Sequence, residues 1–215
     1  MTNTWIPQGV AVTLTVVVMV LLLVHVRHLF RAGPQARLWH GVHVLAALGM
    51  IDMTVPTDLM PVPATAAGGV FVGAASLAGG YTLVGPIRGT RRWSWLWALA
   101  TVHLATMAYM FTTVVPPSDG LTLTLATWAL VDAALWASGP LAARVRTLSE
   151  TAASAGTPGR WTHAAAGYTR SVRVTPAVMG LVMAYMLIAM QFGGSTTHGD
   201  ESEGETPDMI VHQHG

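Results

Sequence analysis

The chain has 215 residues, of which 52% are apolar and only 10% are charged, and its formal net charge at pH 7 is +1. Soluble domains carry roughly 25% charged residues, so this composition is typical of a polytopic membrane protein. The small net charge gives no reason to expect nucleic-acid binding, and the absence of cysteine excludes disulfides, thiolate metal sites and iron–sulfur clusters.

Six apolar windows follow one another along the chain, and each has about the 20 residues that cross a hydrocarbon core of about 30 Å. They predict an all-α fold, a polytopic membrane bundle of six transmembrane helices that occupies residues 1–192. The expected helices lie near 7–29, 36–55, 64–86, 93–115, 121–141 and 172–192. The third window is rich in glycine and alanine, which suits close packing against a neighbouring helix.

Arginine placement predicts the orientation of the bundle. The basic residues are all arginine, and they lie in or beside the first, third and fifth connections: Arg27, Arg31, Arg37, Arg88, Arg91, Arg92, Arg144, Arg146, Arg160, Arg170 and Arg173. The second and fourth connections, around 56–63 and 116–120, contain no basic residue. The positive-inside rule therefore places both termini outside the cytoplasm. Because arginine follows the first apolar run and does not precede it, we expect a retained helix and not a cleaved signal.

Three of the expected helices run outward and carry soft ligands at matched depths. In the last helix Met179, Met183, Met186 and Met190 are spaced four, three and four apart, so they share one face. Histidine and methionine from the other two helices join them, and the predicted metal ligands of the bundle are His103, Met107, Met110, Met183, Met186, Met190, Met50 and Met53. Thioethers and imidazoles suit Cu(I). The alternative is that methionine only fills gaps in the packing.

Asp132 is expected near the middle of the fifth helix, at a depth close to that of His103. An unpaired carboxylate is expensive there, and a hydrogen bond from the His103 ring would satisfy it. The same bond would turn the other ring nitrogen of His103 toward a ligand. The alternative is a purely structural aspartate.

A weaker second cluster is predicted where the first two helices meet. His25 and His28 end one helix, His40 and His43 begin the next, and the hairpin pairs 25 with 43 and 28 with 40 in depth. Four imidazoles at two depths suit Zn²⁺ or copper, and His25 with His43 suits axial ligation of haem b. The alternative is ordinary interfacial histidine beside arginine.

Residues 193–215 form an acidic tail that carries Met209, His212 and His214. Its composition is typical of a disordered solvating segment. A His-x-His pattern with methionine also suits a flexible extracytoplasmic collector of copper.

The stretches WHGVHVLAALGMIDM (39–53) and MGLVMAYMLIAM (179–190) resemble a family of actinobacterial multi-pass membrane proteins of unknown function. The resemblance implies a bundle in the bacterial plasma membrane and supplies no activity. The Met-x-x-x-Met pairs of the last helix are also similar to the filter of eukaryotic copper transporters, which have three helices per chain.

The sequence thus favours an integral membrane copper-binding protein that acquires Cu(I) on the extracytoplasmic side. It would transport the ion or deliver it to a membrane cuproenzyme. One alternative is an accessory structural subunit of a larger complex such as an oxidase or monooxygenase, and another is a b-type cytochrome. No nucleophile elbow, paired-carboxylate arrangement or HExxH motif is present, which disfavours a hydrolytic enzyme.

Overall fold

The computed structural model describes residues 6–31, 34–55, 62–84, 94–112, 118–143 and 164–193. These residues form the helices α1 (Gln8–Arg31), α2 (Pro34–Thr54), α3 (Ala64–Val84), α4 (Ser94–Phe111), α5 (Asp119–Ser138) and α7 (Ala164–Gly193). A further helical turn spans 140–143, and the described part of the chain contains no strand. The predicted all-α fold is confirmed.

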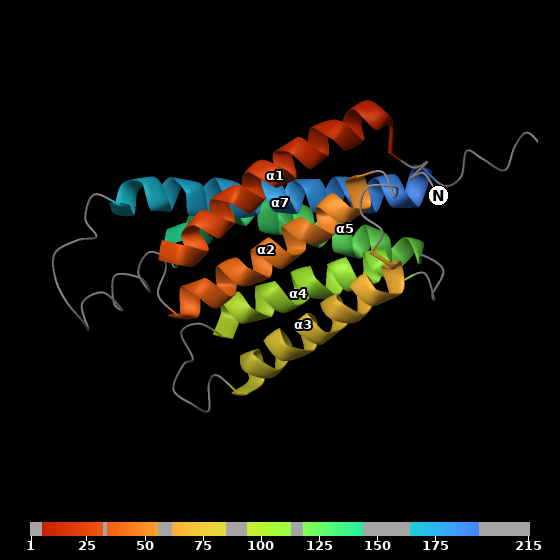
Figure 1. Cartoon of the computed structure of the whole chain (residues 1–215). Coiled ribbons are helices and arrows are strands. Elements are labelled where there is room, and N and C mark those ends of the chain that lie inside the picture. The colour runs from red at the N-terminus through yellow and green to blue at the C-terminus, as the bar shows by residue number, and fades with distance from the viewer. Residues whose placement is uncertain are drawn as a thin grey trace, which may run out of the picture.

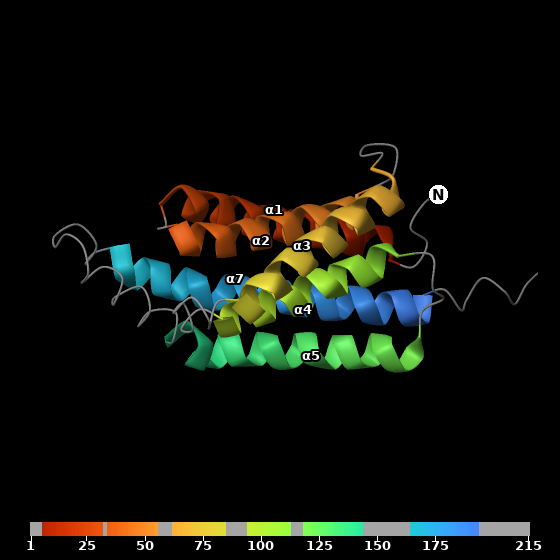
Figure 2. The same ribbon diagram turned by 90° about the horizontal axis from the view of Figure 1, so that it is seen from below.

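The helices run along one bundle and alternate in direction, so that the start of α1 and the end of α7 lie at the same end (Figure 1). The main pairs are α1 with α2, α3 with α4, and α5 with α7, while α2 also contacts α4 and α1 contacts α7. In Figure 2, α7 lies between the α1–α2 hairpin and α5. The outward-running helices of the sequence prediction, α2, α4 and α7, therefore share the interior of the bundle.

Four helices in the described ranges are long and apolar enough to cross a membrane, namely Gln8–Phe30, Ala64–Val84, Asp119–Ser138 and Val172–Phe192. The apolar part of α4, Trp95–Phe111, is shorter. Helix α2 is less apolar because His40, His43 and Asp52 lie within it. The two helices that fall outside the group of four, α2 and α4, carry His43 and His103.

Two helix ends differ most from the sequence prediction. Helix α4 ends at Phe111 and not near residue 115, where β-branched residues lead into Pro116 and disfavour helix. Helix α7 begins at Ala164, before the expected start at 172. Its first turn is a run of alanine, the strongest helix former, so the helix extends beyond the apolar segment.

Large apolar side chains on the outer faces of α1, α3 and α5 are exposed, among them Val12, Val16, Leu23, Val70, Leu77, Leu83, Leu123 and Val131. This distribution is compatible with contact between these faces and lipid. The interior of the bundle is filled by alanine, methionine, leucine and aromatic side chains.

Small residues bring α5 and α7 close together. A Cβ atom added at Gly180 of α7 would lie 2.9 Å from the Ala129 carbonyl oxygen and 3.1 Å from the Ala133 Cβ of α5. Such an approach of two backbones requires glycine, as is common between membrane helices.

We expect Gly180→Ala to lower the free energy of unfolding by about 1–3 kcal/mol, because the new methyl group meets backbone that has no room to move. Thermal unfolding of the detergent-solubilised protein measures the effect. Gly73→Ala in α3 is the matched control, since nothing lies within 4 Å of its Cβ position. Equal stability of the two variants would contradict the close packing of α5 on α7.

Candidate metal site

The methionine faces predicted from the sequence turn into the bundle and not toward lipid. Six methionines are buried within one contiguous apolar core: Met50, Met53, Met107, Met179, Met183 and Met186. Met110 and Met190 are half-buried and pack against that core. Helices α2, α4 and α7 therefore bring their thioethers into the same interior.

A small cavity lies beside Met179 and Met183 of this methionine core. It is lined by Val42, His43, Ala46, His103, Pro176, Met179 and Met183. Its volume of about 10 Å³ is near the lower limit for a single water-sized occupant. Two imidazoles and two thioethers thus border a space that fits one small species.

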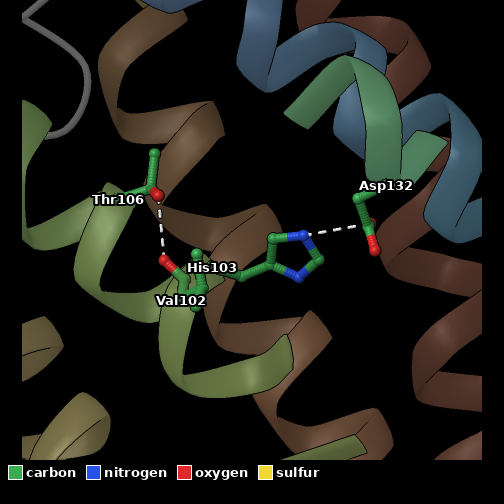
Figure 3. Close-up of polar contacts among 4 residues, drawn as sticks. All are labelled: Val102, His103, Thr106 and Asp132. Atoms are coloured by element: carbon green, nitrogen blue, oxygen red, sulfur yellow. Dashed lines mark hydrogen bonds and ion pairs between the residues drawn. The ribbon is translucent and has the colours of Figure 1, made fainter. Parts of the chain in front are cut away.

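The contact predicted between His103 and Asp132 is present. His103 Nε2 of α4 lies 3.2 Å from Asp132 Oδ2 of α5 (Figure 3), and both side chains are buried. The predicted hydrogen bond itself is not formed, since these atoms have no aligned hydrogen-bond partner in the described part of the chain. The pair is therefore an electrostatic contact that directs Nε2 to the carboxylate and leaves Nδ1 as the second ring nitrogen.

His43 is oriented in a similar way by an oxygen acceptor. Its Nδ1 lies 2.9 Å from the Trp39 carbonyl oxygen, one turn earlier in α2. A carbonyl can only accept, so Nδ1 carries the proton and donates. The lone pair of His43 is then on Nε2. An imidazole whose N–H is held by a carbonyl or carboxylate is the usual arrangement of a histidine that binds a metal.

The four histidines of the α1–α2 hairpin form the cluster that the sequence predicts. His25 stacks on His43 with ring centroids 4.8 Å apart, and the His28 and His40 centroids are 5.0 Å apart. The two pairs are also joined, because His25 Nδ1 lies 3.2 Å from His40 Nδ1. Trp39 packs edge-on against His25, with ring centroids 6.2 Å apart. Trp39 in turn packs against Trp136 of α5.

The two predicted clusters are in fact continuous. His43 meets His103 edge to face, with ring centroids 6.2 Å apart. From the sequence, the hairpin histidines are expected as a separate cluster, and His43 is not among the predicted ligands of the methionine core. His43 and Met50 are seven residues apart and so lie on one face of α2, which is the signal that links the two clusters.

Within the described ranges, no three side chains among histidine, cysteine, aspartate and glutamate are grouped so that they could hold a metal ion. The cavity is a different kind of group, because two of its four potential ligands are the thioethers of Met179 and Met183. For haem b, face-to-face imidazoles do not point two ring nitrogens at one iron, so ligation by His25 and His43 would require the hairpin to open. Met209, His212 and His214 lie outside the described residues.

Comparison with known protein families, with curated proteins and with solved structures finds no match for this chain. The resemblance to actinobacterial multi-pass membrane proteins therefore stays a prediction.

Proposed function

We propose that this protein is an integral membrane Cu(I)-binding protein and that the cavity between α2, α4 and α7 is its binding site. One observation carries the proposal. His43 and His103 each have one ring nitrogen directed to an oxygen acceptor, and both line the same small cavity as Met179 and Met183.

The donor chemistry of the cavity favours Cu(I) over harder cations. Two neutral imidazoles and two thioethers form a ligand set without charge. The thioethers favour Cu(I), because Zn²⁺ is usually held by imidazole, thiolate or carboxylate and Mg²⁺ by carboxylate and water oxygen. A monovalent ion also brings little charge into a buried site. Asp132 lies beside His103 and can compensate that charge.

We further propose six membrane crossings with both termini outside the cytoplasm, in a bacterial plasma membrane. The alternating helices and the arginine-free second and fourth connections support this topology. The fully buried Met50, Met107 and Met186 then lie outward of the cavity. The tail would collect copper through Met209, His212 and His214, and the cavity would pass it inward or to a membrane cuproenzyme.

Anaerobic titration of the purified protein with Cu(I), in competition with a coloured Cu(I) chelator, tests the site. We expect wild-type protein to hold one tight equivalent and Met179→Leu/Met183→Leu to lose it, with at least a tenfold fall in affinity. Leucine conserves the volume of methionine, so the packing survives. Met19→Leu is the matched control, because Met19 lies on the exposed face of α1.

Unchanged affinity in the double variant would remove Met179 and Met183 from the site. Wild-type protein without copper, purified with a partner chain in fixed ratio, would favour the accessory-subunit alternative. A Soret band in the purified protein would favour the cytochrome alternative.

A further inference from the structure

The hairpin histidines extend the cavity as a buried ladder toward the α1–α2 connection. From the cavity outward along this ladder, the rings follow in the order His103, His43, His25, His40 and His28. Neighbouring centroids are 6.2 Å, 4.8 Å, 5.4 Å and 5.0 Å apart. His25 and His40 are fully buried. A continuous series of nitrogen donors therefore connects the cavity with one end of the hairpin.

We propose that this histidine ladder is a transfer route for Cu(I), with His25, held in place by His40, as the station that receives the ion from the cavity. The inference rests on the proposed function of the cavity and adds a path and a direction to it. Under the topology proposed above, the route leads toward the cytoplasmic end of α1 and α2.

The nitrogen that would receive the ion is Nε2 of His25. This atom is buried and has no hydrogen-bond partner in the described part of the chain. Its companion Nδ1 lies 3.2 Å from His40 Nδ1, and one of these two nitrogens must carry the proton between them. If His25 donates, its Nε2 bears an unused lone pair. A buried lone pair without a partner is an energetic cost that a metal ion would relieve.

Transfer is a ligand exchange in which the stacked rings of His25 and His43 must turn, because face-to-face imidazoles do not point two nitrogens at one ion. A bond from Cu(I) to His25 Nε2 forms as a bond to a cavity thioether breaks, and the ion keeps its charge. No electron moves, and each imidazole keeps its own N–H. Transfer requires sites that bind weakly enough to release. A station with a single nitrogen donor, His25 Nε2, suits that requirement better than a closed four-ligand site.

Reconstitution of the full chain into liposomes that enclose a Cu(I)-chelating dye tests the route. Cu(I) is added outside under ascorbate and without oxygen. We expect wild-type protein to load the dye and His25→Phe to do so at least tenfold more slowly, while its cavity affinity in detergent stays within threefold of wild type. Phenylalanine keeps a ring that can stack on His43 and removes both nitrogens.

Leu21→Ala is the control for packing, since Leu21 is buried one turn before His25 on the same face of α1. We expect it to load the dye at nearly the wild-type rate. Loading by His25→Phe at the wild-type rate, or equal slowing in Leu21→Ala, would overturn the route. Wild-type protein that binds Cu(I) in detergent but loads no dye would also overturn it, whereas wild-type protein that binds no Cu(I) would instead refute the proposed function.

X-ray absorption of wild-type protein and of Met209→Leu provides a measurement that does not depend on any substitution within the bundle. At one equivalent of Cu(I) we expect sulfur and nitrogen neighbours from the cavity. The second equivalent should add nitrogen neighbours only. In Met209→Leu protein, whose tail offers no thioether, additional sulfur with the second equivalent would place the next station among the buried methionines and overturn the role of the ladder.

Discussion

His103→Leu alone is expected to lower the free energy of unfolding by about 3–5 kcal/mol, because it leaves the buried Asp132 carboxylate without its partner. Asp132 is 1% exposed, and the His103 ring is its one ion-pair partner in the described part of the chain. The double variant His103→Leu/Asp132→Leu removes both polar groups and should regain most of the loss. Denaturant unfolding in detergent measures the free energy of unfolding of the wild-type protein, His103→Leu and the double variant.

A double-mutant cycle separates this effect from simple loss of packing. Asp132→Leu by itself should cost less than His103→Leu, since a neutral imidazole is cheaper to bury than a carboxylate. Stabilities that add without a coupling energy would show that the contact between the two residues is energetically unimportant.

His43→Phe is expected to lower the affinity for Cu(I) at least 100-fold, which corresponds to about 2.8 kcal/mol of binding free energy. The variant removes a cavity nitrogen whose lone pair is fixed by the bond from Nδ1 to the Trp39 carbonyl. Loss of a directly coordinating group should exceed the 10- to 100-fold cost typical of groups that only orient a ligand. Competition titration with a Cu(I) chelator in detergent measures the affinity of the variant for Cu(I).

His28→Phe is the matched control for His43→Phe. It is the same substitution in the same hairpin, but His28 is half-buried and does not line the cavity. We expect its Cu(I) affinity to stay within threefold of wild type. A similar loss in both variants would mean that the hairpin, and not the cavity, holds the ion.

Hydropathy and helical periodicity were enough to predict much of this fold. The expected spans overlap all of the helices in the described ranges. They could be predicted because a long apolar segment is recognised from the sequence without knowing its neighbours. The spacing of four and three in α7 correctly placed Met179, Met183 and Met186 on one buried face. The pairing of His25 with His43 also followed from the sequence, since a short turn fixes the register of a helical hairpin.

Contacts between hairpins could not be predicted in the same way. Nothing in the local pattern of α2 shows that it meets α4, so the edge-to-face contact of His43 with His103 was missed. Met179 was predicted to share the methionine face of the last helix but was not among the predicted ligands, because the sequence does not show which part of that face lies against His43 and His103. The cavity itself depends on side chains from three helices, and periodicity in one helix carries no information about the next.

Pro176 lines the cavity and is the proline within α7. A proline has no backbone N–H, so one i→i−4 hydrogen bond of α7 is missing at this level, and its ring displaces the carbonyl one turn earlier. Bending α7 at this point sacrifices less hydrogen bonding than bending it elsewhere along Val172–Phe192. The wall of the cavity therefore includes the point at which α7 bends at the lowest cost, and a small bend there would change the separation of Met179 and Met183 from the two imidazoles without unfolding a turn.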